Sequence, residues 1–185
     1  MLFRSIGDLY LNRVVVYNGN GGKYSETVST TVEELFISGM LWEDADNNGL
    51  ASAQETRLEN VSVKLYTVYN PNNGGSPALT VDGVQLSEVY DTNLNKIPTY
   101  ITGPDGTYRF NDLRPGTYYV IAESIDEQYE PTVKGAGTDE NTRTMDSECE
   151  EAFLNDDNDA IIKQIVLTDT SAEHQNFGKI GRAHV

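Results

Sequence analysis

The organisation of this chain follows from one acidic stretch and the two segments beside it. The stretch reads Asp44-Ala45-Asp46-Asn47-Asn48-Gly49-Leu50-Ala51-Ser52-Ala53-Gln54-Glu55. Residues 36–42 precede it and place apolar side chains on both faces of a two-residue repeat, while residues 61–69 follow it with apolar and polar side chains in alternation. Both patterns are typical of β-strands. We therefore expect the acidic stretch to form a loop between two strands.

The acidic stretch has the spacing of an EF-hand calcium loop, D-x-[DN]-x-[DN]-G-x5-E, at every specified position. Ca²⁺ takes about six to eight oxygen ligands at roughly 2.3–2.6 Å, and side chains two residues apart in a coiled loop can face one centre. The alternative is an Asx-rich surface turn that binds nothing. Because strands flank the loop, we expect a structural site and not the helix-opening switch of calcium sensors. The candidate ligands are Asp44, Asp46, Asn48, the Leu50 carbonyl, Ser52 and Glu55.

Short strand-like segments separated by turns continue along the rest of the chain. Turns rich in Gly, Pro, Asn and Asp fall at residues 18–22, 82–83, 104–106 and 114–116, and no segment shows a helical period of 3.6. This spacing predicts an antiparallel β-sandwich and argues against βαβ units. Residues 134–160 are expected to be loop-rich. The expected strands are residues 9–17, 24–31, 36–42, 61–69, a hairpin within 78–90, then 97–102, 107–110, 117–123, 161–167 and 174–179.

Both ends of the chain can be encoded by opposite strands of one oligonucleotide that resembles a sequencing-library adapter. We therefore expect residues 1–5 and 180–185 to be artefactual. Residues 6–34 are predicted to be the end of a preceding β domain or a connector between domains. Residues 35–179 are predicted to form the β-sandwich domain.

The charge of the chain limits its partners. The 185 residues include 13 Lys and Arg against 29 Asp and Glu, for a formal net charge of −16. Such a chain repels the phosphates of nucleic acids and the anionic head groups of membranes. No apolar run approaches the roughly 20 residues of a membrane span, so we expect no membrane insertion in this fragment.

The residue pattern does not indicate an enzyme. The sequence contains no nucleophile elbow, zinc-binding histidine cluster, phosphate loop or dinucleotide fingerprint. Cys149 is the only cysteine, and its neighbours Glu148 and Glu150 should raise its pKa and disfavour a reactive thiolate. We predict a non-catalytic protein, with Trp42 in the core beside the acidic loop.

Four motifs, taken in order, resemble those of a known family. They are Ile37-Ser38-Gly39-Met40-Leu41-Trp42-Glu43-Asp44, Leu58-Glu59-Asn60-Val61-Ser62-Val63-Lys64-Leu65-Tyr66, Asp105-Gly106-Thr107-Tyr108-Arg109-Phe110-Asn111-Asp112-Leu113-Arg114-Pro115-Gly116-Thr117-Tyr118 and Phe177-Gly178. Together they resemble the calcium-binding B repeats of serine–aspartate-repeat surface adhesins, which are related to the prealbumin-like B-type domains of collagen adhesins. The resemblance covers about residues 36–179 and implies an antiparallel Greek-key sandwich, prealbumin-like or immunoglobulin-like.

The resemblance also implies a function and further site residues. It implies a calcium-stabilised stalk or spacer module of a secreted or cell-wall-anchored bacterial adhesin. Its partners would be neighbouring domains of the same chain and, through another domain, a host extracellular ligand. The family carries a late Asp-Ser-Asp element near further calcium, which here reads Asp146-Ser147-Glu148. Asp146 and Glu148 are thus candidate secondary ligands, with a solvated acidic loop as the alternative.

Two other functions stay open at this point. Residues 70–95 are longer than the usual family hairpin, and with the tyrosine-rich strands they could present a surface to a host protein or glycan. The competing interpretation of the tyrosines is packing within the sheets, which Tyr favours. An accessory module of a secreted enzyme is the other alternative. The tyrosines concerned are Tyr66, Tyr69, Tyr90, Tyr100, Tyr108, Tyr118 and Tyr119.

Overall fold

The computed structural model describes residues 9–17, 19–31, 34–73, 76–123, 129–154 and 158–181. The chain divides into two compact units, Met1–Glu34 and Leu35–Val185. The predicted artefactual ends lie outside the described residues except for positions 180 and 181, which belong to the last strand.

The first unit contains one antiparallel hairpin. Strand β1 (Leu9–Tyr17) pairs with β2 (Lys23–Thr31) from Leu9↔Thr31 to Tyr17↔Lys23. The turn between them contains Gly21 at φ 81°, a conformation that glycine adopts without steric cost. The hairpin predicted from the sequence is therefore present. Its assignment to a preceding domain or to a connector stays a prediction.

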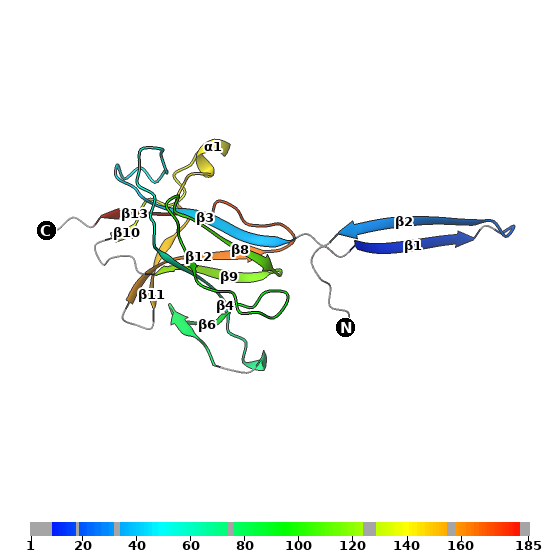
Figure 1. Cartoon of the computed structure of the whole chain (residues 1–185). Coiled ribbons are helices and arrows are strands. Elements are labelled where there is room, and N and C mark those ends of the chain that lie inside the picture. Colours follow the sequence, from blue (N-terminus) through cyan, green and yellow to red (C-terminus); the bar gives the residue numbers. More distant parts are fainter. Residues whose placement is uncertain are drawn as a thin grey trace. The chain divides into compact units, whose positions relative to one another are not determined.

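The second unit is built from two packed sheets (Figure 1). The first sheet has the strand order β10-β13-β3-β8. Its strands are β3 (Leu35–Glu43), β8 (Thr107–Leu113), β10 (Tyr129–Pro131) and β13 (Phe177–Gly181). The second sheet has the order β6-β5-β11-β12-β9-β4-β7. Its strands are β4 (Ser62–Val68), β5 (Leu79–Val81), β6 (Val84–Glu88), β7 (Tyr100–Ile101), β9 (Gly116–Glu123), β11 (Glu150–Leu154) and β12 (Asn158–Leu167).

The predicted fold class is confirmed, with one departure in strand direction. All described strand pairs are antiparallel except β13 with β3, which run parallel through Phe177↔Leu41, Gly178↔Trp42 and Lys179↔Glu43. The first and last strands of this unit are therefore neighbours that point the same way. The chain enters one end of the first sheet and leaves from the other.

The main core lies between the sheets because alternate residues of each strand point inward. In β9 the inward face consists of Tyr118, Val120 and Ala122, which are all buried. Trp42 is fully buried, as predicted. The tyrosines considered above differ in burial: three of them pack in the interior, while Tyr90 is 53% exposed. The buried ones are Tyr66, Tyr108 and Tyr118.

The long segment 70–95 contains β5 and β6, residues 79–88, which we call the insertion. The insertion closes the second sheet into a ring. Strand β6 pairs with β5 on one side and with the end of β4 on the other, through Val68↔Leu86. Strand β5 reaches β11 through Val81↔Leu154, so the pairing runs continuously in the order β4–β6–β5–β11–β12–β9–β4. Closure removes the open strand edges that residues 79–88 would otherwise expose.

The ring encloses a second apolar cluster on the outer face of the sandwich. Strands β4, β9 and β12 contribute Tyr66, Ile121 and Ile162, and the insertion covers them with Val81 and Leu86. Leu86 is fully buried. The insertion thus has a packing role, since it removes from water a sheet face that a shorter hairpin would leave exposed.

One sequence prediction about local structure was wrong, and another was incomplete. Residues 97–102 form only the two-residue strand β7, because Pro98 lacks the N–H that a longer strand would donate. Residues 134–160 are more ordered than predicted. They contain β11 and one helical turn, α1 (Glu140–Arg143), which Asp139 begins by accepting a hydrogen bond from the Thr142 amide at 2.9 Å.

Replacing Leu86 by alanine tests the contribution of the insertion to stability. The change should lower the free energy of unfolding by about 2–5 kcal/mol, because it leaves a cavity under a closed ring. Urea unfolding monitored by circular dichroism measures it. Val84→Ala is the matched control in the same strand, since Val84 is 38% exposed and its loss should cost less than about 0.5 kcal/mol. Equal costs would show that the insertion does not form this core.

Candidate metal centre

The acidic loop connects β3 to β4, as predicted, and its first ligand is anchored inside the protein. Asp44 directly follows β3 and is 3% exposed. Its Oδ1 accepts a hydrogen bond from the Asn48 amide at 3.2 Å, and its Oδ2 accepts one from the Gly49 amide at 2.8 Å. The Thr132 hydroxyl also donates to Oδ2. These donors satisfy a carboxylate that could not otherwise be buried.

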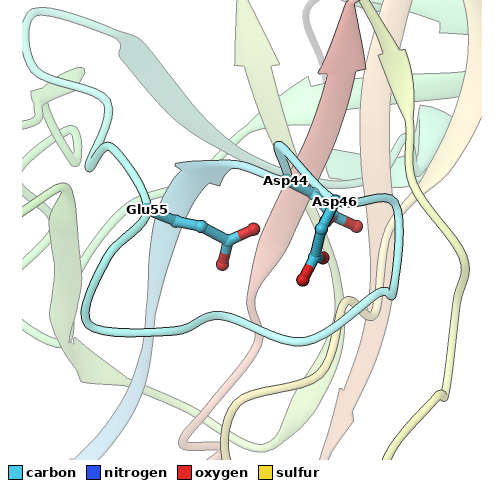
Figure 2. Close-up of side chains that lie close together, drawn as sticks. All are labelled: Asp44, Asp46 and Glu55. Atoms are coloured by element: carbon cyan, nitrogen blue, oxygen red, sulfur yellow. The ribbon is translucent and has the colours of Figure 1, made fainter.

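Three carboxylates of the loop converge. One oxygen each from Asp44, Asp46 and Glu55 lies within 4.8 Å of the other two. Figure 2 shows the Glu55 side chain reaching across the loop toward Asp46. Backbone amides hold Glu55 there, because Ala45 donates to its Oε1 at 3.0 Å and Ser52 to its Oε2 at 2.7 Å.

The other predicted ligands lie in the same loop, and the contacts described for them are structural ones. The Asn48 side chain donates to Asp46 Oδ2 at 2.8 Å and accepts from the Leu50 amide at 2.7 Å. Ser52 contributes its backbone amide to Glu55. The structure therefore brings together three of the six predicted ligands as a carboxylate group, and positions the other three beside it in the loop.

A second segment holds the loop from outside. We call residues 132–148 the strap. The Ala51 amide donates to the Met145 carbonyl at 2.8 Å, and the Ser147 amide donates to the Gly49 carbonyl at 3.1 Å. Leu50 forms an isolated antiparallel bridge with Asp146. The sequence analysis did not find Thr132 or this docking, because no local pattern links residues about 90 positions apart.

Gly49 sits where the strap touches the loop. Its φ is 78°, and a Cβ at this position would lie 2.6 Å from the Val133 carbonyl oxygen. Gly49 is thus required for two reasons: the turn needs its positive φ, and the close approach of the strap leaves no room for a Cβ.

Hydrogen bonds determine the charge state of Asp44. Burial disfavours its ionised form, but donors from Thr132, Gly49 and Asn48 outweigh that effect and hold the pKa of this carboxyl below its usual value. The lowered pKa keeps Asp44 in its charged form at neutral pH. Two unit charges about 4 Å apart repel by about 1 kcal/mol in water and about 4 kcal/mol at an effective dielectric constant near 20.

The donor set fits a hard divalent cation. Carboxylate oxygens from three residues, with amide and carbonyl oxygens in the same loop, are the ligands that Ca²⁺ takes, and no imidazole or thiolate belongs to the group. A bound cation would neutralise the mutual repulsion of the acids.

The two predicted secondary ligands lie at the strap and have different environments. Glu148 forms an ion pair with Lys163 at 2.6 Å. Asp146 is 2% exposed; its Oδ2 accepts from the Gly137 amide at 3.3 Å, and its Oδ1 has no hydrogen-bond partner among the described residues. Burial, together with the nearby Glu148 charge, raises the pKa of Asp146. Neither residue belongs to the group formed by Asp44, Asp46 and Glu55.

Cys149 is unsuited to nucleophilic chemistry, for a reason the sequence did not give. It is 1% exposed, and this burial raises the pKa of its thiol to about 11. The predicted direction is confirmed, but the predicted cause was wrong. The thiol contacts the Ser147 hydroxyl at 3.2 Å, and Glu148 is paired with Lys163.

Two packed sheets, with an acidic loop between β3 and β4, define a β-sandwich module. A sequence model of the SdrD B-like domain family matches residues 71–174, and the chain belongs to this family. The match includes the insertion and the strap, and it begins after the acidic loop.

Two individual proteins are also similar. Colossin-A of Dictyostelium discoideum is 47% identical over 55 residues, which cover 29% of this chain and, to the nearest per cent, 0% of that protein. BcpA, the major pilin subunit of Bacillus cereus, aligns in structure with 98% of this chain and 40% of its own, at a TM-score of 0.35 and 14% identity. The chain thus spans less than half of either protein. The described residues include no helix long and apolar enough to cross a membrane.

Gly49→Ala tests the contact between loop and strap. Gly83→Ala is the matched control, because Gly83 has φ 82° but a Cβ added there would meet nothing within 4 Å. The control should cost about 1–2 kcal/mol for the left-handed backbone alone. Gly49→Ala should cost clearly more, since the strap must also move away. Urea unfolding of both variants measures the difference, and equal costs would contradict the observed close approach.

Asp146→Asn tests the unpaired oxygen. Without calcium at pH 7 the change should raise the free energy of unfolding by about 1 kcal/mol, because it removes a buried charge whose Oδ1 has no hydrogen-bond donor among the described residues. A carboxyl with a raised folded-state pKa stabilises the fold below its unfolded pKa and loses that contribution as pH rises through the folded value. The gain should therefore shrink toward pH 4.

Asp105→Asn is the control for this measurement and should have the opposite sign. Hydrogen bonds from Thr107 lower the pKa of Asp105, so this carboxylate stabilises the fold at neutral pH. Chemical denaturation in a chelating buffer at both pH values tests the pair of variants. A loss of stability in Asp146→Asn at pH 7 would show that the buried oxygen has a partner.

Proposed function

We propose that residues 35–179 are a non-catalytic, calcium-stabilised spacer module of a secreted or cell-wall surface protein. The observation that carries the proposal is the group formed by Asp44, Asp46 and Glu55 in the loop between β3 and β4. The acids repel one another without a cation, whereas Ca²⁺ would join the start and end of the loop. Because the strap contacts the middle of that loop, the cation would also stiffen residues 132–148.

The direction of the chain supports a spacer role. Because β3 and β13 are parallel neighbours, the polypeptide enters and leaves the second unit at opposite ends of one sheet (Figure 1). Modules with this property can be joined in a linear series. The partners of the module in this account are the neighbouring domains of the same chain, and membership of the SdrD B-like family supports a structural role.

The stabilisation has a calculable size. A ligand that binds only the folded state adds RT ln(1 + [L]/Kd), which is about 2.7 kcal/mol at a free concentration of 100 Kd. For a domain of this size, about 1 kcal/mol shifts the thermal midpoint by roughly 2–4 °C. Extracellular calcium is in the millimolar range at which even weak loop sites fill.

Calorimetry of the chain with calcium and with a chelator tests the proposal. Calcium should raise the thermal midpoint by roughly 5–10 °C. The variant Asp46→Asn with Glu55→Gln should lose this increment, because two of the three carboxylates become neutral. Its midpoint in chelator is the baseline for the increment, because the change relieves repulsion but also removes one of the two amide hydrogen bonds that the Glu55 carboxylate accepts.

The control is Asp91→Asn with Asp105→Asn. It removes the same number of charges from two exposed loops in which each carboxylate accepts local backbone amides. This variant should keep the whole calcium increment. If wild type shows no increment, or if both variants lose it equally, the loop is a turn and the calcium-dependent part of the proposal fails.

A further inference from the structure

A cavity opens at the mouth of the closed ring, between the turn of the insertion, strands β9 and β12, and Lys134 of the strap. Its volume is about 320 Å³, which lies at the lower end of the range for small-molecule sites, about 300–1,000 Å³. Mouths of β-barrels are a recurring place for such sites. The apolar part of its lining, which we call the floor, consists of Val81, Val84 and Ile162. The first two come from the insertion, so the cavity exists because the ring is closed.

The rim of the cavity is polar and balanced in charge. Tyr119 and Gln164 stand side by side on β9 and β12, and the Gln164 amide donates to the Tyr119 hydroxyl at 3.0 Å. Asp82 lines the rim from the turn of the insertion, and Lys134 lines it from the strap. Lys163 also borders the cavity, but its side chain points to the inner face of β12, between Ile161 and Ile165. Glu148 offsets the charge of Lys163 at 2.6 Å. The rim itself therefore carries one charge of each sign, from Asp82 and Lys134.

The apolar floor and the polar rim together favour one class of ligand. A chain with a net charge of −16 repels polyanions, and a rim without net charge gives an acidic ligand no compensating attraction. An apolar floor with a half-buried aromatic ring suits a ligand that has an apolar face. Amide, ammonium, phenol and carboxylate groups around it suit hydroxyl groups that both donate and accept. A neutral sugar ring has both features.

We propose that the cavity at the mouth of the ring binds one neutral sugar unit of a glycan. The sugar's apolar face lies on Tyr119 and the valine floor, and its hydroxyl groups contact Gln164 and Asp82. The site involves none of the calcium-loop residues and its test measures binding directly, so its failure can be distinguished from failure of the proposed calcium stabilisation.

Nuclear magnetic resonance of the ¹⁵N-labelled chain tests the proposal. Glucose, galactose, mannose and N-acetylglucosamine are titrated separately, with glucuronate as the charged comparison. At least one neutral sugar should shift the amide signals of residues 81–84, 119 and 162–164, with a Kd on the order of 1–10 mM. Glucuronate should bind more weakly than that sugar.

Two variants make the test specific. Gln164→Ala should weaken binding about five-fold or more, the factor expected for one lost hydrogen bond. Val166→Ala is the control, because Val166 is 65% exposed, two residues further along β12, and outside the cavity. The spectrum and thermal midpoint of each variant establish that it is folded. Absence of shifts with every neutral sugar, stronger binding of glucuronate, or equal binding by Gln164→Ala would each overturn the proposal.

Discussion

The burial of the Asp44 carboxylate is the constraint on which the loop and the strap both depend. A carboxylate at 3% exposure must find hydrogen-bond donors, and it finds them at Asn48, Gly49 and Thr132. The first two coil the loop so that Asp46 and Glu55 approach Asp44. The third comes from a segment about 90 residues away and fixes the strap beside the loop. One buried charge thus couples local geometry to tertiary structure.

Closure of the second sheet into a ring stiffens the same unit without any ion. The insertion returns to the end of β4 and to β11, so the second sheet has no open edge along residues 79–88. The ring and the acidic loop lie on different elements, and each makes a different demand on the sequence. The ring needs apolar side chains such as Leu86, whereas the loop needs carboxylates at fixed spacing. Their contributions to stability should therefore be close to additive.

The sequence predicted what depends on local pattern. Alternating apolar residues indicated the strands, and a spaced run of Asp, Asn, Gly and Glu indicated a loop whose three carboxylates do converge. It also predicted the hairpin at Asp82-Gly83, because that dipeptide turns the chain with positive φ at both residues. These features need only neighbours in sequence.

Features that need distant partners were not predictable in this way. Thr132 resembles any other threonine until the strap docks on the loop, and closure of the ring depends on where β5 meets β11. The raised pKa of Cys149 was predicted from adjacent acids, yet burial by residues of other strands causes it. The short β7 shows the converse case, because a local feature, Pro98 with no N–H to donate, limits this strand to two residues.

Hydrogen–deuterium exchange of the unmodified chain, with calcium and with chelator, tests the central claim most directly. Coupling through Asp44 predicts that calcium slows exchange in residues 44–55 and in the strap, residues 132–148, at the same calcium concentration. Residues 79–88 of the ring should change little. Protection of the loop with no change in the strap, or no protection of either, would contradict the account.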